Sequence, residues 1–222
     1  MKKLLAIILA IALLCIIAVG TTLSYFTDTD YDTNTMTVGK VDIIQKINGN
    51  VDGLAEVKMY PVTINADDTL NNVVDLAVTV TMANDSENAY VRTVFAFEMM
   101  NVNGTWVNPL DNADNKAEVH LNVNGQMSWP GIEFEKNGTR YVVGVFTYGE
   151  MEKNTTTSTG LKQIYLASHV GNEFSDAVGG VYDILVLSQA VQAQGFTSAD
   201  AALTAAFGEV NAANVATWFP NN

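Results

Sequence analysis

Residues 74–82 read VDLAVTVTM, and this stretch shows the strand pattern of the chain most clearly. Apolar side chains stand at every second position from Val74 to Met82, with aspartate, alanine and threonine between them. Because successive side chains of a β-strand point to opposite faces, a period of two puts one face in a core and the other near water. The stretch therefore predicts a half-buried β-strand.

The same kind of segment recurs along the rest of the chain. The segments are short, rich in valine, isoleucine, threonine and aromatic residues, and separated by clusters of Asn, Asp and Gly, which is typical of strands and turns. Besides 74–82, the predicted strands are 37–47, 54–64, 89–99, 119–123, 132–134, 140–148, 161–167 and 181–191. Asn137-Gly138 indicates a tight hairpin, and 101–116 and 150–160 are predicted as polar loops. The sequence predicts an all-β domain.

One segment has a helical period instead. From Thr197 to Phe207, apolar residues fall at i, i+3, i+4, i+7 and i+8, which is the stripe of a helix with one buried face. Thr197 with Asp200 three positions later resembles a capping box, and Gly208 is placed to end the helix in the left-handed conformation. We expect one short C-terminal helix packed against the sheets.

Composition and motifs argue against several classes of protein. Residues 25–222 contain no cysteine, so a hydrophobic core rather than disulfides must stabilise them. The chain has 11 basic and 24 acidic residues and a net charge of −13, whereas nucleic-acid binding depends on basic clusters. Its two histidines, His120 and His169, are far apart, and no zinc-protease helix, nucleophile elbow or phosphate-binding loop is present. The sequence predicts neither a catalytic residue nor a dedicated metal site, and therefore not an enzyme.

The first residues have the order of a secretory signal peptide. Lys2 and Lys3 precede an apolar run that ends at Val19, and small residues follow. Small residues at 18–20 and at 22–24 both suit a signal peptidase, and we favour cleavage after Ser24, with Tyr25 as the new first residue. The alternative is an uncleaved anchor, although the run falls just short of the ~20 residues that span a bilayer. We therefore expect a signal peptide (1–24), an extended segment (25–36) and a secreted domain (37–222). We expect only the signal peptide to contact a membrane, and only before cleavage.

A row of carboxylates follows the expected cleavage point. Asp28, Asp30 and Asp32 alternate with other residues, as oxygen ligands do at the start of a calcium-binding loop. Counted from Asp28, the sixth and twelfth positions hold Thr33 and Gly39 rather than Gly and Glu, which excludes an EF-hand. The segment is either a solvated stretch or a weak calcium site, and no other cofactor is indicated.

The extended segment also has the character of a strand without a core of its own. It comprises Tyr25, Phe26, Thr27, Asp28, Thr29, Asp30 and Tyr31. Such a segment can lie in a groove of its own molecule, or it can add to the exposed sheet edge of a neighbour. Addition to a neighbour does not close on itself, so it builds filaments.

The junction Tyr25-Phe26-Thr27-Asp28-Thr29, with the following stretch NTMTVGKVDI (34–43), resembles the hallmark of the SipW-processed secreted proteins, the TasA and camelysin family. AYVRTVFAFE (89–98) and AVQAQGF (190–196) are also similar to family members. The resemblance implies an antiparallel β-sandwich of jelly-roll type whose copies assemble into extracellular fibres of a biofilm matrix. The donor strand implied by the resemblance lies at about 25–35, and the implied partners are further copies of the chain and other matrix proteins.

Two other functions stay open alongside a structural fibre subunit. One is a monomeric cell-surface binding module, assisted by calcium, which differs only in whether the N-terminal segment docks in its own molecule. The other is a secreted metalloprotease of the camelysin kind, for which the sequence offers no recognisable zinc site.

Overall fold

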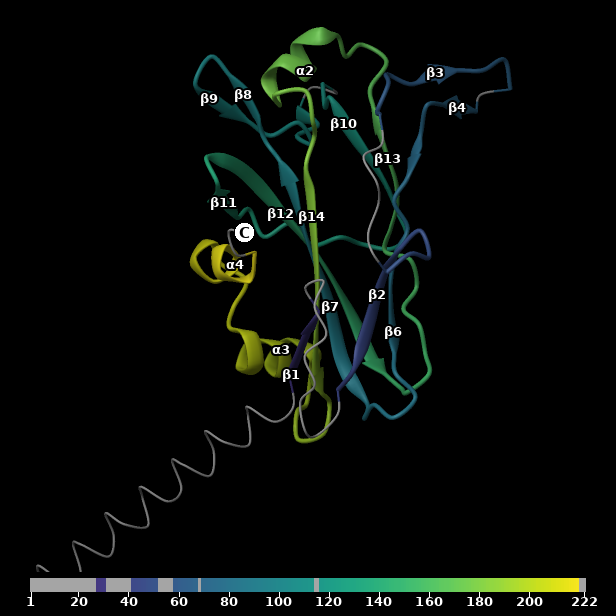
Figure 1. The fold of residues 1–222 in the computed structure, drawn as a ribbon, viewed down its shortest axis with the longest axis vertical. Helices are drawn as coiled ribbons and strands as arrows, with labels where there is room; N and C mark the ends of the chain where they lie inside the picture. Colours follow the sequence, from purple (N-terminus) through teal and green to yellow (C-terminus); the bar gives the residue numbers. More distant parts are fainter. Residues whose placement is uncertain (1–26, 31–40, 52–57, 68, 114–115, 220–222) are drawn as a thin grey trace, which may run out of the picture.

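A computed structural model describes residues 27–30, 41–51, 58–67, 69–113 and 116–219 (Figure 1). Its largest sheet has the strand order β1-β14-β7-β12-β11, and every neighbouring pair is antiparallel. The strands of this sheet are β1 (Thr27–Asp30), β7 (Ala89–Glu98), β11 (Glu133–Lys136), β12 (Thr139–Met151) and β14 (Ile184–Gln192). The described part of the chain is thus mainly β with antiparallel sheets, which confirms that part of the predicted fold class.

Smaller antiparallel sheets accompany this one. One joins β10 (Val119–Val123), β13 (Leu161–Leu166) and β5 (Val74–Asp75), and another joins β2 (Ile43–Ile47) and β6 (Val78–Met82). Two hairpins stand apart from them, β3 (Thr63–Ile64) with β4 (Leu70–Asn71), and β8 (Met100–Val102) with β9 (Thr105–Val107). Within the described residues, no helix is long and apolar enough to cross a membrane.

The prediction of a single short helix is wrong, because three lie in the described part of the chain: α2 (Asn172–Ala177), α3 (Ala199–Phe207) and α4 (Ala212–Trp218). The predicted helix is α3, and Gly208 ends it with a positive φ of 84°, although its ψ of 170° differs from the left-handed helical conformation that was expected. Ser198 rather than Thr197 caps its start, since the Ser198 side chain accepts a hydrogen bond from Ala201 N at 3.2 Å. The other two helices are short and carry no comparable apolar stripe, so the spacing of apolar residues alone did not reveal them.

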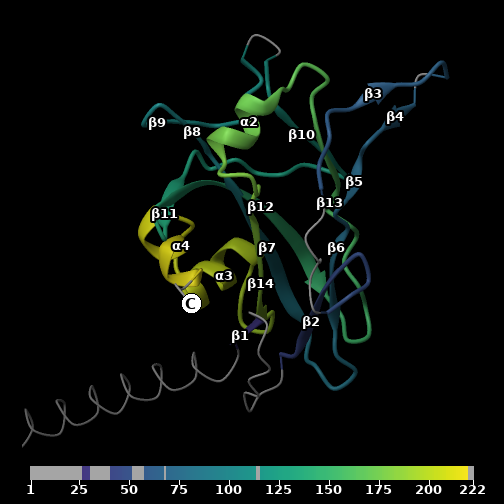
Figure 2. The same cartoon turned by 45° about the horizontal axis from the view of Figure 1, so that its top comes forward.

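The central strand β7 is buried on both faces. Val91, Phe95 and Phe97 face one side, where they pack with residues of the two smaller sheets. The other side, which carries Arg92 and Val94, faces α3 and α4 (Figures 1 and 2). The helices α3 and α4 and the smaller sheets therefore lie on opposite faces of the large sheet, whereas Phe174 of α2 packs on the side of the smaller sheets.

The continuous alternation at 74–82 is divided between two sheets, with β5 in one and β6 in another. The Asn48 side chain explains the break: its Nδ2 donates to Asp75 O at 2.8 Å, and its Oδ1 accepts from Ala77 N at 2.7 Å. These bonds take the place of ladder hydrogen bonds for Asp75 O and Ala77 N, while Leu76 N between them donates to Lys162 O at 2.8 Å. The face pattern survives the break, because Leu76, Val78, Val80 and Met82 are all buried.

Several predicted boundaries also change. The predicted loop 101–116 contains most of the β8–β9 hairpin, which turns at Asn103 and Gly104 with φ values of 53° and 84°. The hairpin predicted at Asn137-Gly138 is present between β11 and β12 with positive φ at both residues. In the described parts of the predicted strands 37–47 and 54–64, only 43–47 and 63–64 are strand.

Candidate assembly site

β1 forms an edge of the large sheet, so its outer side has no strand neighbour among the described residues. It pairs with β14 in an antiparallel register that sets Thr27 opposite Val191 and Asp30 opposite Ser188. Figures 1 and 2 show β1 beside β14 and close to α3. The sequence left open where the predicted donor strand docks, and the structure pairs its residues 27–30 with a strand of the same chain.

The acceptor strand β14 is buried on both faces next to β1. Ala190 packs with the cluster that includes Ile43 and Met82 of the small β2–β6 sheet. Val191 packs on the opposite face against Ala202 and Leu203 of α3. Since β7 covers the other edge of β14, only the edge toward β1 is left for strand pairing. Without β1 this edge would be unpaired, and an unpaired edge is a template for strand addition.

A chain of hydroxyl groups ties β14 to its neighbours on one face. The Ser188 hydroxyl donates to Gln45 Oε1 at 2.6 Å, and Thr93 Oγ1 lies 3.0 Å from Ser188 Oγ. Because the single hydroxyl proton of Ser188 goes to Gln45, Thr93 is the donor of the second bond. Ser188 and Thr93 are both fully buried. These bonds connect β14 to β7 and to β2 beside the docking edge.

On the helix face, Arg92 and Gln189 form a buried polar pair. Arg92 Nε donates to Gln189 Oε1 at 2.6 Å, and Arg92 Nη2 donates to Gly208 O at 3.4 Å. The guanidinium lies 4.6 Å from the ring centre of Trp218 and 5.8 Å from that of Phe207. Burial lowers the pKa of Arg92 to about 10, while the charge of Asp200 acts in the opposite direction. Arg92 thus joins the sheet to both C-terminal helices.

Gln189 has an unused donor at the docking edge. An arginine only donates, so Gln189 must present its oxygen to Arg92 and its amino group elsewhere. That buried Nε2 has no hydrogen-bond partner among the described side chains and backbone, and Gln189 is 1% exposed. Gln189 lies directly opposite Thr29 in the β1–β14 register. The acceptor strand therefore has one unsatisfied polar group at a pairing position.

A second polar cluster lies at the other end of β14. Glu98 is 7% exposed and accepts a hydrogen bond from Asp183 N to Oε2 at 2.7 Å. Burial, together with the charge of Asp183, raises the pKa of Glu98 to about 7, against the lowering effect of that hydrogen bond. Burial and the charges of Asp183 and Glu98 likewise raise the pKa of Tyr141 to about 12. The hydroxyl of Tyr182 is buried nearby and has no hydrogen-bond partner within the part of the chain that the structure describes.

Of the predicted site residues, only Thr27, Asp28, Thr29 and Asp30 fall within the described residues. The cleavage point at Ser24 and Tyr25, and the residues Phe26, Tyr31 and Asp32, lie outside them. Among the side chains that the structure describes, no three of His, Cys, Asp or Glu are grouped to hold a metal ion. Calcium at Asp28, Asp30 and Asp32 stays a prediction.

The burial of Arg92 was not predicted from the sequence. The signal was present in part, because Arg92 is the single charged residue in the stretch 89–97 and Gln189 the single glutamine in 184–191. A charged residue in a strand buried on both faces needs a partner across the sheet. Comparison of the chain with known proteins adds no further assignment: no protein-family model, no curated protein and no solved structure matches it.

Proposed function

We propose that the chain is a secreted structural subunit of an extracellular fibre or matrix, and that its copies assemble by donating the N-terminal strand to a neighbour. The observation that carries this proposal is the pairing of β1 with the edge of β14. Main-chain hydrogen bonds supply most of such a contact, and every copy offers the same strand and the same edge. The pairing within one chain can therefore be exchanged for the same pairing between chains.

The proposed exchange depends on concentration. Residues 31–42 join β1 to β2, which is part of the folded domain, and a short tether of this kind sets an effective concentration in the millimolar range for pairing with β14. Pairing within the chain therefore prevails in dilute solution, whereas pairing between chains gains when copies are crowded at a surface.

The proposal includes the jelly-roll β-sandwich implied by the family resemblance. It is supported by the two clusters that fill the space between the large sheet and the smaller sheets, one around Phe95 and Ile164 and the other around Val91 and Val80. Secretion is supported by the charged, apolar and small-residue order of residues 1–24.

The proposal can be tested by comparing the protein that begins at Tyr25 with one that begins at Val38. Size-exclusion chromatography and negative-stain microscopy over a range of concentrations should show filaments for the longer form only. A matched control keeps the length but carries Asp28→Pro and Thr29→Pro. Adjacent N–H groups of a strand point in opposite directions, and proline has no N–H group. The two substitutions therefore remove at least one N–H group of β1 that donates to β14. A longer form that stays monomeric at every concentration contradicts the proposal.

One observation favours the monomeric binding module as a second candidate. The N-terminal strand already has a partner within its own chain, which is what that function requires. In this case the Tyr25 form would be monomeric throughout, and removal of β1 would lower the stability of the domain without changing its state of association.

A further inference from the structure

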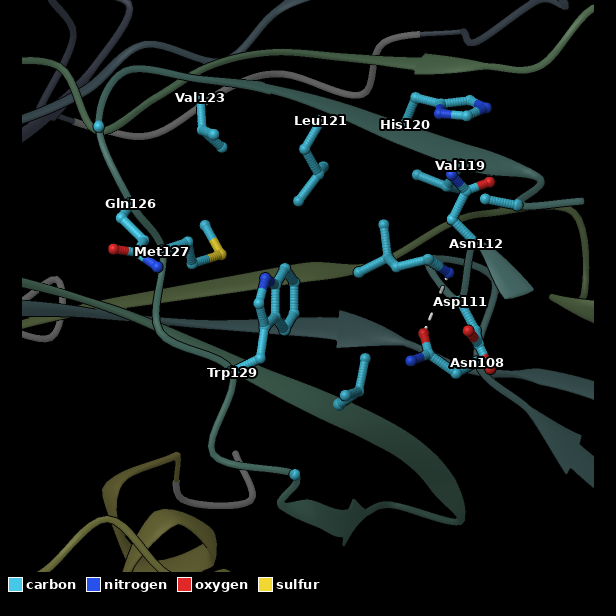
Figure 3. Close-up of a pocket in the computed structure, with 15 residues that line it drawn as sticks. Asn108, Asp111, Asn112, Val119, His120, Leu121, Val123, Gln126, Met127 and Trp129 are labelled. Carbon is cyan, nitrogen blue, oxygen red and sulfur yellow. Dashed lines mark hydrogen bonds between the residues drawn. The ribbon is translucent and has the colours of Figure 1, made fainter. Parts of the chain in front are cut away.

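A cavity of about 550 Å³ opens beside β10, at the end of the molecule opposite β1 (Figures 1 and 3). β10 forms one wall with Leu121 and Val123, and the segment from Gly125 to Gly131 forms another. The third wall is the 108–112 turn, which supplies Asn108, Asp111 and Asn112. The volume is within the range of about 300–1,000 Å³ typical of small-ligand sites.

Trp129 stands in this cavity (Figure 3). Its side chain is 46% exposed, whereas tryptophan side chains are highly buried on average. Neighbouring residues hold its ring in place. The ring centre lies 5.8 Å from that of Phe97 in a tilted arrangement. A Cβ atom at Gly144 would lie 3.2 Å from Trp129 Cζ3 and would collide with Met127 Sδ. The missing side chain at Gly144 thus makes room for Met127 and Trp129, so the indole is fixed in place while part of its surface stays open.

The turn opposite the indole supplies polar groups that are also held in place. Asn108 Oδ1 accepts from Leu110 N at 3.0 Å, which leaves the Asn108 amino group as a donor (Figure 3). Asp111 Oδ1 accepts from Ala113 N at 3.0 Å, which leaves the second carboxylate oxygen as an acceptor. Asn112 is exposed and makes no hydrogen bond to any described residue. One cavity therefore combines an aromatic surface with free amide donors and a free carboxylate acceptor.

This combination suits a sugar ring. A pyranose presents a face of C–H groups that packs on an aromatic ring, and a rim of hydroxyl groups that both donate and accept hydrogen bonds. A purely apolar ligand would leave the amides and the carboxylate of the turn desolvated without partners, at a cost. An anionic sugar would meet the charge of Asp111 on a chain whose net charge is −13.

We propose that this cavity binds a neutral sugar unit of an oligosaccharide or polysaccharide, with Trp129 as the stacking surface and Asn108, Asp111 and Asn112 as the hydroxyl-binding groups. The site lies away from the β1–β14 edge, so the inference does not depend on strand exchange. In a fibre the site would recur once per subunit, and repeated weak sites on one assembly bind a polysaccharide by avidity.

The test is an NMR titration of the ¹⁵N-labelled protein with neutral cellotetraose, chitotetraose and maltotetraose, and with anionic trigalacturonate. At least one neutral sugar should shift the Trp129 indole N–H and the backbone amides of 108–112 in a saturable way, with a dissociation constant below about 10 mM. The three neutral sugars differ in linkage and substituents, so the one that binds best identifies the ligand.

Three variants distinguish a loss of sugar binding at the site from a loss of folding. Trp129→Ala should weaken binding at least about tenfold, as expected for an aromatic anchor. Asn112→Ala removes a side chain without described partners, so it should weaken binding about threefold or more while the fold stays intact. Tyr60→Ala removes another exposed aromatic ring outside the cavity and should change nothing. The proposal is overturned if no neutral sugar shifts these resonances at about 20 mM, if only trigalacturonate does, or if Trp129→Ala and Asn112→Ala bind like the parent protein.

Discussion

Replacing Glu98 with glutamine should make the protein more stable at neutral and alkaline pH. The buried Glu98 carboxyl has a pKa of about 7 in the folded protein, against an ordinary value of 4.5. Between these two values the folded chain holds a proton that the unfolded chain has lost, so this group makes the free energy of unfolding fall as the pH rises. At about 1.4 kcal/mol per tenfold change in the ionisation constant, the full effect is about 3 kcal/mol.

Glutamine keeps the shape of the side chain and an oxygen that can accept from Asp183 N, but it never ionises. Glu98→Gln should therefore match the parent protein near pH 4.5 and exceed its unfolding free energy by about 2–3 kcal/mol above pH 8. Urea unfolding followed by tryptophan fluorescence, repeated from pH 4.5 to 8.5, measures this difference. Glu87→Gln removes the same charge from an exposed position and serves as the control. A constant difference between Glu98→Gln and the parent protein across this range would refute the reasoning.

Three further changes test the packing around the large sheet. Arg92→Ala leaves the Gln189 oxygen unpaired and removes the contacts of the guanidinium with both C-terminal helices. It should lower the unfolding free energy, measured in urea, by about 3 kcal/mol. Arg140→Ala at an exposed position is the control and should lower it by less than about 1 kcal/mol. Ser198→Ala removes the α3 cap and should cost about 1 kcal/mol, and a cost near zero would place the cap elsewhere. Gly138→Ala forces a side chain onto a φ of 83° in the β11–β12 turn and should cost about 1 kcal/mol, measured as a lower thermal midpoint.

The features that could be predicted from the sequence are those that neighbouring residues determine. The β11–β12 hairpin follows from Asn137 and Gly138, and α3 follows from its apolar stripe and from Gly208. Alternation in 74–82 predicted correctly which side chains are buried. It did not predict that the strand changes sheet, because the cause is Asn48, which is remote in sequence.

The candidate sites depend on contacts between distant segments and were therefore harder to predict. The burial of Arg92 results from α3 and α4, which pack over β7 from the far end of the chain. The sugar-site cavity brings together residues 108–112, β10, and Trp129 held over Gly144, and no local pattern connects them. The extended N-terminal segment was predicted from its composition, but its pairing with β14 required the fold.

Strand exchange can be tested most directly by disulfide trapping, because residues 25–222 contain no cysteine. Thr27 and Val191 lie directly opposite each other in the β1–β14 register, and such pairs have Cα separations that a disulfide can span. One protein carries Thr27→Cys and a second carries Val191→Cys, and the two are mixed at high concentration and oxidised. The account predicts a covalent heterodimer on non-reducing gels, and oligomeric ladders when both cysteines are in one chain. If the mixture gives no heterodimer and the double variant forms its disulfide only within single chains, the N-terminal strand is not exchanged and the assembly proposal is wrong.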